Sequence, residues 1–164
     1  MLLGSLVAGC SRIDYGNPTP EDIPRLVIEA YNDVNRGFDI RDLNIYGRRE
    51  YIENDFPALR AIRDLVLTHP DGLITLVRLY GDDDRELRVK AVLITRLLLN
   101  FDAISFRDLP RERLDEVVAA LEPFLQDDDA VTRRVAELLL RGVRKAIARA
   151  RTAEAEAGRS LCGV

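Results

Sequence analysis

Apolar residues recur along most of this chain at the three- and four-residue spacing of an amphipathic helix. Val and Ile follow the same spacing instead of the alternation that is typical of a strand. Gly, Pro and Asp residues interrupt the pattern and divide it into segments. The sequence therefore predicts an all-α domain over residues 19–157, with helices at about 19–36, 57–68, 71–80, 85–99, 110–126 and 130–157.

The first predicted helix has clear start and stop signals. Thr19 suits the N-cap, Pro20 suits the first helical position, and Asp22 is the acid that completes a capping box. Gly37 is a typical C-terminal stop. The following residues, 38–54, show no clear helical pattern, and a connection of this length inside a compact helical domain is often functional.

One segment of the chain occurs twice. The sequence Gly-Asp-Asp-Asp-Arg-Glu-Leu-Arg starts at position 81, and Gln-Asp-Asp-Asp-Ala-Val-Thr-Arg starts at position 126. Asp82 therefore aligns with Asp127, an offset of 45 residues. Two helices per unit at a period of this size are typical of an α-solenoid, in which each repeat buries its apolar face against its neighbours.

The two copies resemble HEAT repeats. In that family a first helix ends on aliphatic residues, the chain turns through Asp-x-Asp, and a second helix opens with an aliphatic residue, Arg and a later Ala. The matching residues are Asp82, Asp84, Leu87, Arg88 and Ala91 in the first copy, and Asp127, Asp129, Arg133 and Ala136 in the second. The resemblance covers residues 70–148 and implies a short α-solenoid of antiparallel helix pairs. It also implies that the two arginines bond Asp side chains in the turn of an adjacent repeat.

Residues 1–10 are apolar and end in the small residues Val-Ala-Gly before Cys10, after which residues 11–18 are polar. Such a run is typical of the end of a secretory signal peptide. The motif resembles the lipobox of a bacterial lipoprotein, although no Lys or Arg precedes the run. The resemblance implies that Cys10 is diacylated and that residues 11–18 form a tether. An apolar N-terminus packed on the domain is the alternative interpretation.

Composition and charge narrow the functional classes. The chain has 164 residues, of which 47% are hydrophobic and 32% charged, as in an ordinary globular domain. Its net charge of −4 argues against a general nucleic-acid binder. Arg outnumbers Lys by 22 to 2, which is typical of a GC-rich bacterial genome.

The C-terminal segment has the opposite charge balance. Residues 130–164 contain eight Lys or Arg and three acids, a local net charge of +5. Four of these cations share the flank of the last predicted helix that lies opposite its apolar face. This flank is either a solvated surface or a site for an acidic partner or anionic lipid headgroups. The candidate partner-binding residues are Arg134, Arg141, Lys145 and Arg149.

Candidate catalytic chemistry is sparse. The Asp runs at 82–84 and 127–129 lack the glycine and distal glutamate of a calcium loop, and each precedes a helix that acids can cap. His69 is the single histidine, and no Cys is near it. Cys162 falls in a tail at 158–164, and we find no Gly-rich phosphate loop or Gly-x-Ser-x-Gly elbow. We predict no catalytic residue, metal site or cofactor.

These observations lead to one main hypothesis and two alternatives. The main hypothesis is a non-enzymatic HEAT-like lipoprotein of the bacterial cell envelope, which Cys10 anchors to the membrane and whose body binds another protein. The first alternative is a cytosolic HEAT-like module whose C-terminal helix binds an acidic protein or, less favoured by charge, nucleic acid. The second is an enzyme subunit that uses residues 38–54. The sequence does not indicate an oligomeric state.

Overall fold

The computed structural model describes residues 15, 17–37, 56–69, 71–100, 106 and 111–161. Within these ranges every regular element is a helix, so the all-α prediction is confirmed. The α-helices are α1 (Ile23–Gly37), α3 (Pro57–Thr68), α4 (Gly72–Arg78), α5 (Arg85–Asn100), α6 (Arg111–Leu121) and α7 (Ala130–Leu161). Short 3-10 helices precede α1 and follow α4 and α6: η1 (Pro20–Asp22), η2 (Leu79–Gly81) and η4 (Glu122–Gln126).

Most helix boundaries agree with the predicted ones because the apolar period and the capping residues indicate the same positions. The largest difference lies at the end of α7, which continues to Leu161 instead of stopping at 157. Its last turns are rich in Ala, Glu and Arg, which have high helix propensity. The predicted tail at 158–164 is therefore helical over most of its length.

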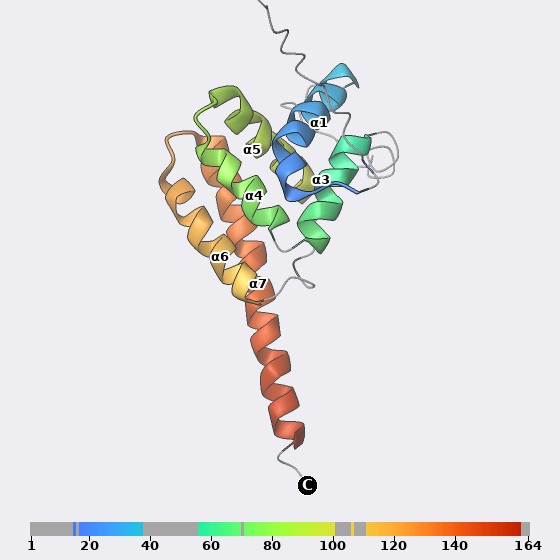
Figure 1. The fold of residues 1–164 in the computed structure, drawn as a ribbon. Helices are drawn as coiled ribbons and strands as arrows, with labels where there is room; N and C mark the ends of the chain where they lie inside the picture. The colour runs from blue at the N-terminus through green and yellow to red at the C-terminus, as the bar shows by residue number, and fades with distance from the viewer. Residues whose placement is uncertain are drawn as a thin grey trace, which may run out of the picture.

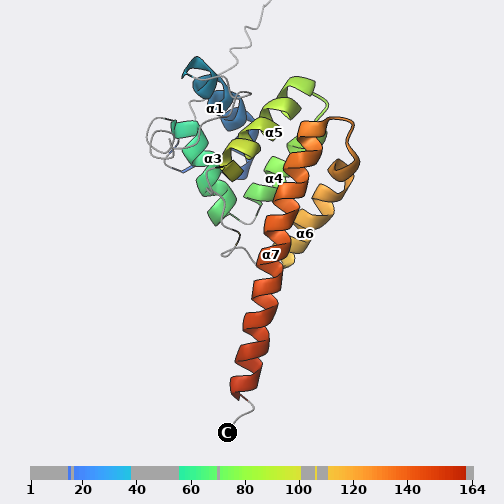
Figure 2. The ribbon, with the colours of Figure 1, turned by 180° about the vertical axis from the view of Figure 1, so that it is seen from behind.

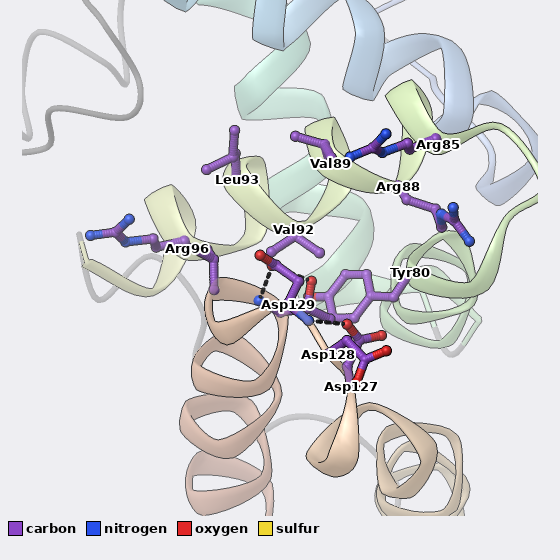
Figure 3. A pocket seen from close by; sticks show the side chains of 12 residues that line it. Tyr80, Arg85, Arg88, Val89, Val92, Leu93, Arg96, Asp127, Asp128 and Asp129 are labelled. Carbon is purple, nitrogen blue, oxygen red and sulfur yellow. Dashed lines mark hydrogen bonds between the residues drawn. The ribbon is translucent and has the colours of Figure 1, made fainter.

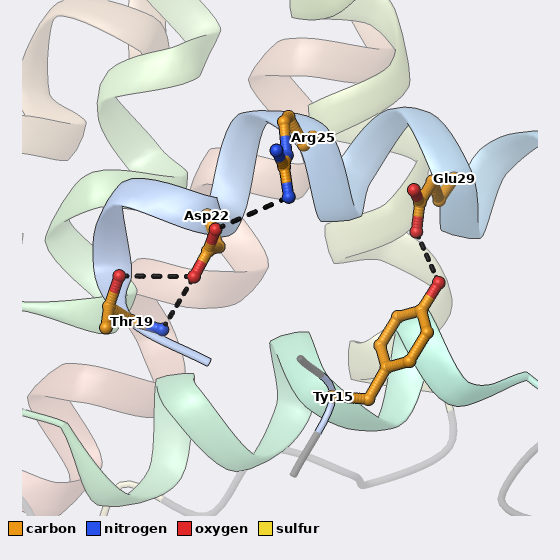
Figure 4. A network of polar contacts seen from close by, with 5 residues as sticks. All are labelled: Tyr15, Thr19, Asp22, Arg25 and Glu29. Carbon is orange, nitrogen blue, oxygen red and sulfur yellow. Dashed lines mark hydrogen bonds and ion pairs between the residues drawn. The ribbon is translucent and has the colours of Figure 1, made fainter. Parts of the chain in front are cut away.

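The start of α1 confirms the predicted capping box (Figure 4). The backbone N–H of Thr19 donates to the carboxylate of Asp22 over 3.0 Å, and that carboxylate also pairs with Arg25 at 3.8 Å. Upstream of the cap, the hydroxyl of Tyr15 donates to the carboxylate of Glu29 over 2.5 Å. Tyr15 is thus attached to the middle of this helix.

The helices pack in neighbouring pairs, which Figures 1 and 2 show from opposite sides. The helix α1 lies against α3 and α5, and α3 packs on α4. The helix α4 contacts α6, α5 contacts α7, and α6 packs along α7. The pair α4/α5 therefore lies beside the pair α6/α7. Their shared core is aliphatic, with fully buried side chains that include Leu73, Leu76, Ile94, Leu97, Leu121 and Leu139.

The helix α7 is longer than the body on which it packs. Its predicted apolar face is confirmed, because Val135, Ala136, Leu139, Val143 and Ile147 are all buried. Beyond that face α7 continues away from the other helices (Figures 1 and 2). No helix in the described ranges has the length and hydropathy needed to cross a membrane.

The exposure of two adjacent residues of α5 differs from what their residue types favour. The apolar Val89 is 44% exposed, whereas the charged Lys90 is only 9% exposed. The ammonium of Lys90 lies 2.6 Å from the carboxylate of Glu86 and 5.3 Å from the ring centroid of Tyr31. Position 90 is four residues before the buried Ile94, so its aliphatic stem packs inward while its charge is paired.

Candidate interaction site

The turn before α5 is closed by its aspartates, as predicted. The backbone N–H of Asp84 donates to the carboxylate of Asp82 over 2.9 Å. The carboxylate of Asp84 accepts from the backbone N–H groups of Glu86 at 2.8 Å and Leu87 at 3.3 Å. These N–H groups have no partner within the helix, and negative charge is favourable at its N-terminus.

The turn before α7 repeats this arrangement 45 residues later. The N–H of Asp129 donates to the carboxylate of Asp127 over 2.8 Å, and the carboxylate of Asp129 accepts from the N–H of Thr132 over 2.7 Å. The backbone angles agree as well, with φ −61° and ψ 148° at Asp82 and φ −60° and ψ 145° at Asp127. The aspartates of both copies therefore cap helices in the same way.

Neither aligned arginine bonds an aspartate side chain among the described residues, so within this part of the chain the implication of the resemblance is wrong. Arg133 donates to the backbone carbonyl oxygens of Asp127 and, over 3.0 Å, of Asp128 in its own turn. Arg88 makes no hydrogen bond or ion pair with any described residue. The carboxylates of Asp127 and Asp129 accept from backbone N–H groups of the same turn, and Arg133 bonds the carbonyl oxygens of that turn.

A groove of about 530 Å³ lies between α5 and the turn that begins α7 (Figure 3). Its size falls within the range of roughly 300–1,000 Å³ that is usual for ligand pockets. The helix α5 forms one wall and the second Asp turn forms the other. The lining residues are Tyr80, Arg85, Arg88, Val89, Val92, Leu93, Arg96, Asp127, Asp128, Asp129, Val131 and Thr132.

The wall formed by α5 has three arginines that pair with no described residue. Within the described chain, Arg85, Arg88 and Arg96 form no ion pair and no side-chain hydrogen bond. In Figure 3, Arg85 and Arg88 lie toward one end of the groove and Arg96 toward the other. The opposite wall is acidic, but its carboxylates do not pair with these arginines. The groove thus separates positive charge on α5 from negative charge on the Asp turn.

The groove also exposes apolar surface. Four large hydrophobic side chains stand out as exposed in the described ranges, and two of them, Val89 at 44% and Val131 at 36%, line this groove. Val92 and Leu93 also line the groove and are largely buried. Exposed apolar side chains beside charged ones in one groove are the combination that a bound molecule can use.

Tyr80 adds a buried polar group to the lining. Its side chain is 3% exposed, and its ring meets that of Phe124 edge-on, with centroids 5.4 Å apart. Burial raises the pKa of Tyr80 well above its ordinary value, and the neighbouring Thr95 hydroxyl opposes this shift only in part. The phenol oxygen has no hydrogen-bond partner among the described residues, and the Thr95 hydroxyl donates to the carbonyl of Ala91 over 2.8 Å.

We expect Tyr80→Phe to leave the protein as stable as the original or to stabilise it by up to about 2 kcal/mol. The reason is that a buried hydroxyl without a partner costs about 1–3 kcal/mol of desolvation, which phenylalanine avoids while keeping the ring contact. Urea unfolding followed by circular dichroism measures the difference. A loss of more than about 1 kcal/mol would show that the hydroxyl has a stabilising partner.

The four predicted partner-binding cations lie on the exposed flank of α7. Arg134, Arg141, Lys145 and Arg149 are all exposed, as expected from the helical period. Arg134 pairs with Glu137 at 3.3 Å, whereas the other three have no partner among the described residues. Their exposure is confirmed, and their role in binding stays a prediction.

The groove itself is not among the features predicted from the sequence. The resemblance implies a structural role for Arg88, and Arg85 and Arg96 belong to no predicted site. A signal was present, because Arg85, Val89, Val92 and Arg96 follow one another at spacings of four, three and four residues and therefore share one stripe of α5. The other wall comes from a turn more than thirty positions later in the chain, and the period of α5 alone cannot indicate it.

Three predicted features lie outside the described residues: Cys10 with its lipobox, the connection at 38–54, and Cys162. His69 is described, and its ring Nδ1 accepts from the backbone N–H of Asp71 over 3.2 Å in the turn between α3 and α4. Among the described side chains, no three of His, Cys, Asp and Glu converge in a way that could hold a metal ion.

No family model, curated protein or solved structure matches the chain. What it binds must therefore be inferred from its own sequence and geometry.

Proposed function

We propose that the protein is a non-enzymatic interaction module of the bacterial cell envelope, anchored to the membrane by a lipid on Cys10 and binding another protein through its helical body. The observation that carries the binding role is the groove beside α5, where exposed Val89 and Val131 adjoin three arginines that have no partner in the described chain. Exposed apolar surface and unpaired charge together favour a surface that is completed by a partner.

The body of this module is a short HEAT-like α-solenoid in our proposal. Two observations support it. The pair α4/α5 packs beside the pair α6/α7, with α4 against α6 and α5 against α7. In both turns the first Asp carboxylate, of Asp82 and of Asp127, accepts from the backbone N–H two residues later, and the backbone angles are nearly the same, at the 45-residue offset of the sequence repeat.

The lipid anchor is supported by the sequence Val-Ala-Gly-Cys10 after an apolar run. The contact between Tyr15 and Glu29 shortens the effective tether, because the chain is attached to α1 four residues after Ser11. The five residue steps from Cys10 to Tyr15 span at most roughly 18 Å. A lipid on Cys10 would therefore hold α1 close to the bilayer surface.

Replacing Cys10 tests the anchor. With its full upstream sequence in a bacterium, the protein should incorporate labelled fatty acid and sediment with membranes, and Cys10→Ser should abolish both. Cys162→Ser is the matched control and should change neither, because only Cys10 follows an apolar run that ends in small residues. Labelling that persists in Cys10→Ser would contradict the proposed address. One acyl chain anchors weakly, so stable attachment requires two or three chains on this cysteine.

A second candidate function is electrostatic binding through the exposed flank of α7, to an acidic protein, nucleic acid or anionic lipid. Arg141, Lys145 and Arg149 favour it because they are exposed and have no partner among the described residues. This contact would be screened by salt, whereas a lipid anchor would not. Membrane association that survives Cys10→Ser but is lost in high salt would therefore favour the second candidate.

A further inference from the structure

We infer that the groove between α5 and the second Asp turn binds a protein segment in which an apolar side chain is flanked by Asp or Glu. This inference rests on the proposed binding function and names the partner's chemistry. The apolar side chain would cover Val89 and Val131, and the partner's carboxylates would face the arginines of α5. Binding would supply the partners that these groups lack within the described chain.

The positions of the charges decide which part of the partner faces which wall. Arg85, Arg88 and Arg96 all come from α5, so the positive charge extends along that wall. Guanidinium groups bind carboxylates through two parallel hydrogen bonds, and the α5 arginines are not engaged by any described residue. The partner's acids would therefore lie along α5, spaced on either side of the residue that covers the valines.

The acidic wall argues against a nucleic acid in the same groove. Asp127, Asp128 and Asp129 lie opposite the arginines, and phosphates that follow one strand through the groove would approach both walls. The aspartates would repel the phosphates on their side of the groove, whereas a peptide can place all its acids on the side of the arginines. The groove therefore favours a peptide with acidic residues on one side over a nucleic acid, which is negatively charged along its whole length.

The free end of α7 in a second copy is a poor occupant for the same reason. Residues 130–164 have a net charge of +5, which the three arginines on α5 would repel. The basic flank of α7 and the groove are thus suited to different contacts. A partner with acidic and apolar residues fits the groove better than the chain's own C-terminal helix.

The test is selection from a displayed library of random short peptides on the full chain carrying Cys10→Ser, which keeps the lipid out of the assay. Enriched peptides should contain Leu, Ile, Val or Phe next to Asp or Glu. One enriched peptide is then synthesised with a fluorophore and titrated by anisotropy. Arg85→Glu with Arg88→Glu should weaken its affinity at least roughly tenfold, since reversed charges would repel its acids.

Two further variants keep the test informative. Val89→Ser should weaken binding without changing the charge of the groove. Arg96→Gln should also weaken binding, and it removes one positive charge without introducing a negative one. The matched control is Arg60→Glu with Arg144→Glu, which reverses the same charge at exposed arginines of α3 and α7 outside the groove. The control should bind as the original does, and circular dichroism should show that every variant remains folded.

Several results would overturn the inference. These are the absence of enriched peptides, enrichment of Lys and Arg, or affinities that the groove variants leave unchanged. It also fails if a labelled single-stranded oligonucleotide binds and is released by Arg85→Glu with Arg88→Glu, or if those changes abolish self-association in sedimentation. Failure of the membrane assay would instead reject the lipid anchor and leave the groove result standing, so the two proposals are distinguishable.

Discussion

Ile94→Ala should lower the free energy of unfolding by about 2–5 kcal/mol, because it removes a large side chain from the centre of the core and leaves a cavity. Ile94 has no solvent exposure and lies on the face of α5 that packs within the body. The helix α5 packs against both α1 and α7, which fix its position. The core can therefore close only part of the cavity. Urea unfolding followed at 222 nm measures the loss as a lower midpoint with an unchanged slope.

His69→Ala is the comparison for this experiment. Its ring Nδ1 accepts one hydrogen bond from the N–H of Asp71 in a partly buried turn, so its removal should cost no more than about 1 kcal/mol. If His69→Ala cost more than Ile94→Ala, the assignment of Ile94 to the core and His69 to the turn would be wrong. Equal and large losses would point instead to a turn that α3 and α4 need for docking.

The helices could be predicted because local signals agree along the chain. Around α1, the cap at Thr19, the proline at position 20 and the glycine at position 37 mark the ends that the apolar stripe also indicates. The Asp turns were predicted as caps for the same reason, since each carboxylate acts on N–H groups two or three residues away. Such contacts join residues that are close in sequence, so the local sequence is enough to predict them.

The details that failed depend on neighbours in space. Lys90 is buried because Tyr31 of α1 and Glu86 surround its stem and charge, and α1 lies far from it in sequence. Arg88 and the acids of the second turn line the same groove without bonding one another, which the resemblance to a repeat family does not indicate. The groove needs both α5 and that turn in position. Its arginines share a visible stripe in the sequence, but the opposite wall appears only when the two helix pairs are packed together.

We expect Gly72→Ala to cost about 3 kcal/mol or more, even though it adds only one methyl group. A Cβ at position 72 would lie 2.7 Å from the carbonyl carbon of Leu65 and closer still to its oxygen, with the backbone nitrogen of Val66 at 3.1 Å. These are backbone atoms of α3, which cannot rotate aside as a side chain can. The substitution would therefore force α3 and α4 apart along their packed interface.

Gly81→Ala is the matched control for this prediction. A Cβ there would meet only the ring edge of Phe124, at 3.4 Å, and Gly81 is exposed. The change should therefore leave stability unaltered or raise it by up to about 1 kcal/mol, because alanine restricts the unfolded chain more than glycine does. Thermal and urea unfolding of the two variants side by side gives the comparison. Equal stability of Gly72→Ala and Gly81→Ala would mean that α3 and α4 approach less closely than their backbone positions indicate, and that position 72 tolerates a side chain.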